Sequence, residues 1–292
     1  MAADITLKDL PLIVIVGPTA SGKSGMAIEL AEQYGGEIIC ADSRTVYVGM
    51  DIGTAKPSHQ DQARVPHWGL DIVLPGESFS AADFKAYALQ KIDEIRARGH
   101  VPFLVGGTGL YIDSIVFDYQ FGPPSDLEKR AKLEHMTVDE LYKYCIQNNI
   151  TLPENEKNKR YLIRAIERNN APGERLLTPI NNCIIVGITT EKEILRARIH
   201  KRSEQLFDDG VVQEAKLLGD TYGWENEAMT GNIYKLSRAY LHNEITQEEF
   251  KLRNETADWQ LAKRQLTWLK RNQFIQWMDL GEVKNYIART LA

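Results

Sequence analysis

An apolar run followed at once by a glycine-rich loop is the feature of this chain that most restricts its fold. Residues 12–16 read LIVIV and residues 17–24 read GPTASGKS, after which a helical pattern continues to Tyr34 and ends at Gly35 and Gly36. A buried strand, a glycine-rich turn and a helix N-terminus direct several backbone N–H groups and the positive end of the helix dipole at one small volume. The order of these segments predicts a loop that binds a di- or triphosphate.

The residue types in this loop indicate what each contributes. We expect Lys23 to reach the outer phosphate oxygens and the Ser24 hydroxyl to bind a Mg²⁺ ion that offsets phosphate charge. The residues predicted to bind the diphosphate or nucleotide are Gly17, Pro18, Thr19, Ala20, Ser21, Gly22, Lys23 and Ser24. The loop alone does not say which bond of the bound molecule is broken.

Composition limits the class of protein. The chain has 292 residues, enough for one large α/β domain with an insertion or for two modest domains. Its three cysteines, at 40, 145 and 183, lack the spacing of a zinc site or a disulfide framework and are typical of thiols in a reducing cytosol. We expect a cytoplasmic monomer that does not associate with membranes, since no signal segment or membrane-spanning apolar run is present. The net charge of −5 argues against unselective nucleic-acid binding but leaves room for a local basic surface.

The distribution of apolar runs predicts a parallel α/β sheet. Strands are expected near 12–16, 37–41, 69–73, 101–105 and 183–188, with helical patterns between them. From Thr190 to the end the pattern is helical, and residues 245–249 look like a capped helix start.

Two breaks in the pattern indicate an insertion. Turn-forming residues at 121–125 and 169–173 bound a charged helical segment. We therefore predict a P-loop NTPase-like parallel sheet flanked by helices, with its first part at 1–120 and its completion and C-terminal helices at 179–292. A small, mainly helical insertion domain is expected at 121–178.

Two further segments follow expected strands and carry polar groups. Asp42 comes directly after 37–41, at the strand end where open α/β sheets place their chemistry. Its carboxylate suits a magnesium-directed acid or a general base, and a helix N-cap is the structural alternative. Residues 106–111, GGTGLY, let a ligand approach the backbone closely, and Thr108 offers a hydroxyl. The strand before them ends in glycine rather than an acid, which disfavours an ordinary ATPase.

Taken together, six segments resemble the tRNA dimethylallyltransferases, also called tRNA isopentenyltransferases. They are GPTASGKS at 17–24, ADSRTVYVGMDIGTAKP at 41–57, VPHWGLDIV at 65–73, FLVGGTGLY at 103–111, RAIE at 164–167 and AKRQLTWLKR at 262–271. The resemblance implies transfer of a dimethylallyl group from dimethylallyl diphosphate to N6 of the adenosine on the 3′ side of the tRNA anticodon, with release of diphosphate.

The resemblance also implies that the insertion at 121–178 contacts tRNA, and it implies roles for single residues. Asp42 would accept the N6 proton, Thr108 would contact the flipped-out base, Lys23 would stabilise the leaving diphosphate, and Lys235 is the aligned candidate for a second diphosphate contact. The residues implied to bind tRNA are Asp42, Ser43, Arg44, Thr45, Thr108, Arg160, Arg164, Lys263, Arg264 and Gln265. The chain departs from the family pattern at Thr45, Tyr161, 231–235 and 258–259.

Three basic clusters favour contact with RNA phosphates in an otherwise acidic chain. They consist of Lys157, Lys159, Arg160 and Arg164; of Arg196, Arg198, Lys201 and Arg202; and of Lys263, Arg264, Lys270 and Arg271. Each cluster by itself is also compatible with a solvated helix face. Trp259, Trp268 and Trp277 are more typical of a packed core than of base stacking.

Two other classes of function remain open on the residues alone. One is an adenylate isopentenyltransferase or a small-molecule kinase that shares the phosphate loop but not the RNA substrate. The other is a non-catalytic tRNA-binding homologue. Salt-sensitive affinity for tRNA would distinguish a tRNA-modifying enzyme from the first class. Binding of tRNA without magnesium-dependent release of diphosphate would indicate the second class.

Overall fold

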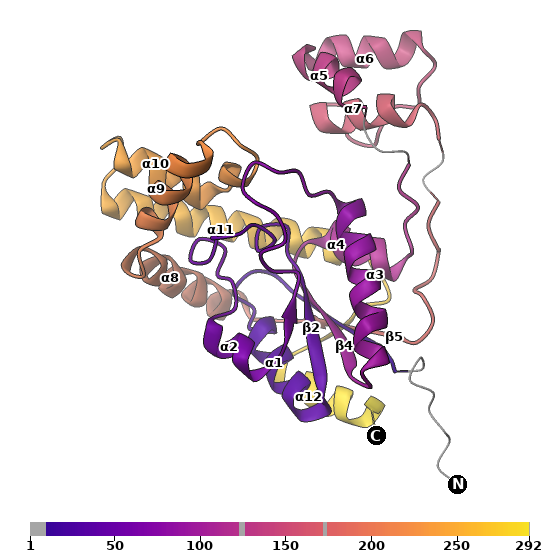
Figure 1. The fold of residues 1–292 in the computed structure, drawn as a ribbon, viewed down its shortest axis with the longest axis vertical. Coiled ribbons are helices and arrows are strands. Elements are labelled where there is room, and N and C mark those ends of the chain that lie inside the picture. Colours follow the sequence, from indigo (N-terminus) through magenta and orange to yellow (C-terminus); the bar gives the residue numbers. More distant parts are fainter. Residues whose placement is uncertain (1–9, 123–125, 172–173, 292) are drawn as a thin grey trace. The chain divides into compact units, whose positions relative to one another are not determined.

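The computed structural model describes residues 10–122, 126–171 and 174–291. Its centre is a six-stranded sheet in the order β3-β2-β4-β1-β5-β6, in which every neighbouring pair is parallel (Figure 1). The strands are β1 Leu12–Val16, β2 Gly36–Ala41, β3 His67–Trp68, β4 Val101–Gly106, β5 Cys183–Ile188 and β6 Gln276–Met278. The predicted α/β class with a parallel sheet is thereby confirmed.

Two details of the strand prediction are wrong. The strand expected at 69–73 is instead the two-residue β3, and Val73 pairs only in an isolated bridge with Tyr47. Gly69 has φ of +87°, which interrupts the extended backbone. The helical prediction from 190 to the end misses β6, whose three residues are too short to show a period in the sequence.

Helices pack on both faces of the sheet, and others pack against one another beside it. Together they are α1 Lys23–Tyr34, α2 His59–Arg64, α3 Ala81–Ala97, α4 Gly109–Val116, α8 Lys192–Asp208, α9 Val211–Tyr222, the 3₁₀ helix η2 Ala228–Thr230, α10 Asn232–Leu241, α11 Gln247–Leu269 and α12 Leu280–Leu291. Helix α1 ends at Gly35, which has φ of +62°. The capped start expected at 245–249 is confirmed, because Thr246 and Glu249 form a capping box at the start of α11.

Alternate residues of β1 supply two hydrophobic cores. Leu12, Val14 and Val16 belong to the core that contains buried residues of α3 and α4. Ile13 and Ile15 belong to the core that contains buried residues of α1 and α12. Figure 1 shows α3 and α4 on one side of the sheet and α1 and α12 on the other. Burial on both faces explains why β1 reads as an unbroken apolar run rather than an alternating one.

The described residues divide into two compact units, and the second comprises 118–177. It contains α5 Leu127–His135, α6 Val138–Gln147 and α7 Lys159–Arg168. Leu141 and Cys145 of α6 pack with Leu162, Ile163 and Ile166 of α7 in a small core. The sequence-based boundaries at 121 and 178, and the RNA-contacting role given to this segment, stay predictions. Among the described residues, no helix is both long and apolar enough to cross a membrane.

Candidate active site

The glycine-rich loop connects β1 to the first turn of α1, as its sequence predicts. Lys23 is the first residue of α1, and its ammonium nitrogen lies 3.2 Å from the Pro18 carbonyl oxygen. Ala20 and Gly22 have φ of +61° and +91°, so the chain turns sharply before the helix. A Cβ atom on Gly17 would lie 2.8 Å from Ser21 Oγ, which explains why a residue without a side chain stands there.

A cavity of about 610 Å³ lies against this loop and the carboxyl ends of β2 and β4. Four of the residues singled out in the sequence line it together: Lys23, Ser24, Asp42 and Thr108. Its lining also includes Thr19, Ala20, Gly22, Ser43, Arg44, Thr45, Arg264 and Gln265. These residues come from four separate stretches of the chain and meet at one edge of the parallel sheet, where ligands bind in open α/β folds.

Asp42 and Thr108 belong to two loops that are hydrogen-bonded to each other. The Ser43 N–H donates to Thr108 Oγ1 at 3.1 Å, and the Thr108 N–H donates to the Ala41 carbonyl oxygen at 3.2 Å. Asp42 Oδ1 accepts the Arg44 N–H at 2.8 Å. Asp42 Oδ2 accepts no hydrogen bond from the residues that the structure describes, and the Thr108 hydroxyl keeps its proton available to donate.

Burial shapes the charge of Lys23. Removal from solvent lowers the pKa of Lys23 to about 8, the nearby Asp42 carboxylate opposes this change, and the Arg202 charge adds to it. The free site therefore favours the neutral amine of Lys23 more than water does. A bound anion would reverse this effect, because an opposite charge at close range favours the charged form of lysine.

Two long helices contact the outer side of the phosphate-binding loop. From α8, Arg202 Nη1 donates to Thr19 Oγ1 at 2.7 Å and Arg198 Nη1 donates to the Ser21 carbonyl oxygen at 3.0 Å. From α11, Gln265 Oε1 accepts the Thr19 N–H at 2.7 Å. The loop is therefore held by residues about 180 and 246 positions away in the chain.

Arg202 and Asp258 face each other in the cavity. Arg202 Nε lies 3.9 Å from Asp258 Oδ2, and the side chains are 25% and 15% exposed. Within the described residues both atoms are buried without a hydrogen-bond partner. Burial raises the pKa of Asp258, and the Arg202 charge lowers it. The sequence assigned Arg202 to an RNA-contacting cluster and noted Asp258 only as a departure, so neither was expected beside the phosphate loop.

Gly107 and Gly109 allow helix α11 to pack close to this loop. A Cβ atom on Gly107 would collide with the Gln265 side chain, and one on Gly109 would collide with the Trp268 indole. Trp268 Nε1 also donates to Asp113 Oδ2 at 2.7 Å. The sequence expectation that these glycines admit a ligand thus has a structural alternative, namely the close approach of α11. The core interpretation of Trp268 accords with these contacts.

The remaining predicted site residues lie in varied surroundings. Arg44 donates to the Glu227 and Ala228 carbonyl oxygens at 3.0 and 3.3 Å and so holds the turn before α10. Thr45 is only 5% exposed. Lys235 and Lys263 are exposed and do not line the cavity. Arg160 and Arg164 lie on α7 of the second unit. The binding roles of these residues stay predictions.

The donor set at the loop fits a magnesium ion that takes most of its ligands from phosphate and water. Ser24 is exposed at the loop and lines the cavity with Asp42. Among the described residues, no group of three or more His, Cys, Asp or Glu side chains is arranged to hold a metal. Mg²⁺ commonly binds through one or two protein oxygens together with substrate phosphates, so a full protein cage is not required.

Comparisons with known proteins agree on one group of enzymes. The IPP transferase family model matches residues 45–272, and the isopentenyl transferase model matches residues 10–73. A tRNA dimethylallyltransferase of Anoxybacillus flavithermus is 38% identical over 283 residues, covering 93% of this chain and 91% of the relative. The solved full-length tRNA isopentenylpyrophosphate transferase of Bacillus halodurans is 35% identical, with 96% of each chain covered and a TM-score of 0.74. A eukaryotic dimethylallyltransferase acting on tRNA, 24% identical, shares the fold with a TM-score of 0.80 over 92% of this chain and 73% of its own.

Proposed function

Because this chain belongs to the tRNA dimethylallyltransferase family, we propose that it transfers a dimethylallyl group from dimethylallyl diphosphate to N6 of the adenosine 3′ to the anticodon. Membership follows from a family model that matches residues 45–272 and from relatives 34–39% identical over more than 90% of the chain. The observation that carries the proposal is that Lys23, Ser24, Asp42 and Thr108 line one cavity. A cytoplasmic monomer is proposed with it.

The diphosphate is bound by the glycine-rich loop. Backbone N–H groups at the start of α1 and the Lys23 ammonium contact its oxygens. Arg202 lines the same cavity and is already hydrogen-bonded to Thr19 of the loop, so it adds a second positive charge to the site. A Mg²⁺ ion held through Ser24 would supply further charge neutralisation to the phosphate oxygens. Lys235 does not line the cavity, but it follows the lining residue Tyr234 in the chain and remains a candidate contact.

Transfer forms one bond and breaks one. The N6 lone pair of adenosine attacks C1 of the allylic group, and the C1–O bond breaks with its electron pair leaving on diphosphate. Lys23, Arg202 and the loop N–H groups stabilise the negative charge that develops on the leaving group. The N6 proton passes to Asp42, which keeps one carboxylate oxygen outside its bond to Arg44. Thr108 donates its hydroxyl proton to an acceptor on the base.

The acceptor is an RNA base that leaves its stack to enter the cavity. Extruding a base costs a few kcal/mol, and less from a single-stranded loop than from a duplex. Phosphate contacts from Arg160, Arg164, Lys263 and Arg264, with Ser43, Arg44, Thr45 and Gln265 near the base, are proposed to hold the anticodon arm.

The test is transfer to a defined acceptor. Purified protein is incubated with Mg²⁺, dimethylallyl diphosphate and unmodified tRNA, with free AMP as a parallel acceptor, and the digested nucleosides are weighed by mass spectrometry. A mass gain of one dimethylallyl group on tRNA adenosine is expected. Gain on AMP alone would favour the adenylate enzymes, and tRNA binding without any product would favour a non-catalytic homologue.

A further inference from the structure

One carboxylate in the first unit accepts four hydrogen bonds from two segments that line the cavity. Glu214 lies on α9. Its Oε2 accepts the N–H groups of Asp51 and Ile52 at 2.9 and 2.6 Å. Its Oε1 accepts the Gly53 N–H and the Tyr234 hydroxyl, both at 2.9 Å. Each oxygen thus accepts two hydrogen bonds, and all four acceptor positions of the ionised carboxylate are occupied.

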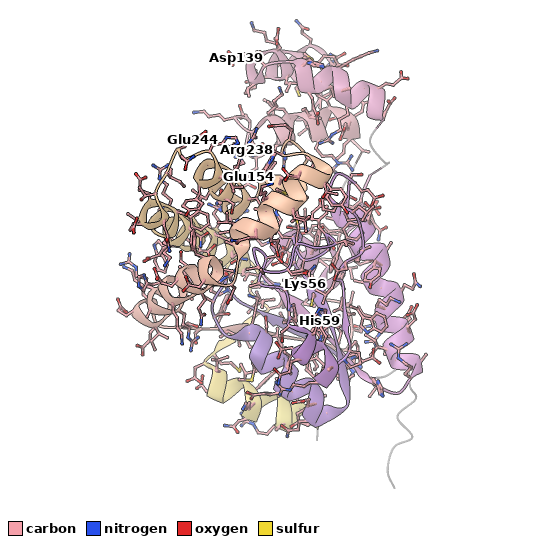
Figure 2. The ribbon with its side chains drawn as sticks, turned by 60° about the vertical axis from the view of Figure 1, so that its left-hand side comes forward. Lys56, His59, Asp139, Glu154, Arg238 and Glu244 are labelled. Carbon is pink, nitrogen blue, oxygen red and sulfur yellow. The ribbon has the colours of Figure 1, made fainter. Side chains whose placement is uncertain are left out.

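The turn that Glu214 binds is held tightly on its other side as well. The ammonium of Lys56, whose side chain is 3% exposed, lies 2.6 Å from both Asp51 Oδ1 and Asp71 Oδ1. It also donates to the Tyr47 carbonyl oxygen at 3.1 Å. Figure 2 labels Lys56 in this loop and His59 at the start of the α2 helix that follows.

Glycine at position 53 is required by the contact with Tyr234. A Cβ atom at Gly53 would lie 2.8 Å from Tyr234 Oη and 3.2 Å from Glu214 Oε1. Burial, and then the charge of Glu214, raise the pKa of Tyr234, so its hydroxyl stays protonated and donates. The carboxylate, the phenol and the turn therefore form one close-packed unit.

The two segments joined by Glu214 face the reacting groups. Gly53, Thr54, Ala55 and Tyr234 line the cavity that Lys23 and Asp42 also line, whereas Glu214 does not. Arg44 connects the same wall to the Asp42 turn, because its guanidinium is bonded to the segment that ends at Thr230, next to α10. Hydrogen bonds thus connect this wall of the cavity to the turn that carries Asp42, the proposed general base.

We propose that Glu214 is a positioning residue for the transfer reaction, which holds the 53–55 turn and Tyr234 as one wall of the substrate cavity. The proposal deepens the proposed function and rests on it. Glu214 touches neither substrate: it fixes the surface against which the adenine and the allylic group meet in line for attack. Small displacements of such a surface cost large factors in rate.

The variant Glu214→Gln tests this assignment. It keeps the shape of the side chain but replaces one acceptor oxygen by an NH₂ group, which leaves two of the four donors facing another donor. The matched control is Asp220→Asn, which neutralises a carboxylate on the same helix that pairs with Lys216 on the surface. Titration with inorganic diphosphate measures the fraction of protein molecules whose phosphate-binding loop is intact. The rate of transfer to tRNA is then divided by that fraction, which gives transfer per intact loop.

Glu214→Gln is expected to bind diphosphate within about twofold of wild type and to lose roughly ten- to a hundredfold in transfer per intact loop. Asp220→Asn should match wild type in both measurements. Transfer per intact loop that is unchanged in Glu214→Gln, or a loss that disappears once intact loops are counted, would overturn the proposal and leave Glu214 a purely structural residue.

A second readout does not depend on turnover. Hydrogen exchange should accelerate at least tenfold in Glu214→Gln for the amides that face the new NH₂ group, which are either Asp51 and Ile52 or Gly53, and should remain unchanged in Asp220→Asn. Equal exchange in Glu214→Gln and wild type would also overturn the proposal. Wild-type protein that transfers to no acceptor would count against the proposed function, whereas the exchange result would still decide whether Glu214 holds this wall.

Discussion

At the scale of single residues, Asp42 is the proposed general base of the transfer. Its replacement by asparagine keeps an oxygen for the Arg44 N–H, now 2.8 Å from Oδ1, but removes the proton acceptor. Transfer should fall by roughly two to four orders of magnitude, the usual scale for loss of a general base, while tRNA affinity stays the same. Single-turnover transfer and tRNA binding by filter retention measure the two quantities. Unchanged transfer would remove Asp42 from the role of base.

Lys23 makes diphosphate binding depend on pH in a defined direction. Its pKa of about 8 in the free protein means that the ammonium is largely charged below pH 8 and increasingly neutral above it. Since the charged form binds the diphosphate, affinity should be highest below pH 8 and should fall as pH rises, approaching tenfold per pH unit until the pKa of the bound form is reached. Calorimetric titration with inorganic diphosphate between pH 6.5 and 9.5 measures this profile.

Lys23→Arg is the matched variant for the pH profile. Guanidinium keeps its charge over the whole range, so the profile of this variant should show only the titration of diphosphate itself, which wild type shares. Lys23→Ala should weaken diphosphate binding and transfer together. A wild-type profile that runs parallel to that of Lys23→Arg would show that Lys23 does not carry the charge that binds the donor.

At the scale of elements, α11 reaches the site because glycines let it approach the 106–109 loop. Gly109→Ala places a methyl group against the Trp268 indole, so α11 must shift or the loop must deform. We expect a loss of about 1–3 kcal/mol in the free energy of unfolding, the usual cost of overpacking. Because Gln265 on the same helix binds the phosphate loop, diphosphate affinity should fall with it.

The control for this prediction is Gly281→Ala, near the start of α12. The nearest atom to its added Cβ would be Asp279 Oδ1 at 3.4 Å, an ordinary contact, so stability should be unchanged or slightly higher. Urea unfolding of the two variants gives the comparison. Equal stability of Gly109→Ala and wild type would mean that the close packing of Trp268 is not a constraint on the loop.

The same elements show what the sequence could and could not predict. The loop at 17–24 and the strands β1, β2, β4 and β5 were predictable because local signals, an apolar run and a glycine-rich turn before a helix, coincide there. Gln265 on Thr19, Arg202 on the same loop and Glu214 under the 51–53 turn were not, because each joins residues at least 161 positions apart. Conversely, the sequence shows that residues 106–109 are rich in glycine, but the reason for Gly107 and Gly109, the close approach of α11, involves residues far away in the chain.

At the scale of the whole molecule, an acidic protein is proposed to bind a polyanion. The net charge of −5 opposes association, so binding must come from local cations whose contacts release counterions from the RNA. The affinity for tRNA should therefore fall steeply between 50 and 200 mM salt. Affinity that does not depend on salt would contradict binding through phosphates.

The units of the molecule can be tested separately through this salt dependence. Lys263→Ala on α11 and Arg160→Ala on α7 each remove one proposed phosphate contact, in the first and the second unit respectively. Each should weaken binding to different tRNAs by a similar factor and reduce the slope of log affinity against log salt by about 1. Neither residue lines the cavity, so diphosphate binding should not change.

Arg253→Ala provides the matched control, because Arg253 is an exposed cation on α11 that pairs with Glu249 and belongs to none of the basic clusters. Its salt slope should equal that of wild type. If Arg160→Ala also leaves the slope unchanged while Lys263→Ala lowers it, Arg160 makes no phosphate contact. A lowered slope in both variants requires that the two units bind the same RNA, since a single bound tRNA then loses counterion release from each.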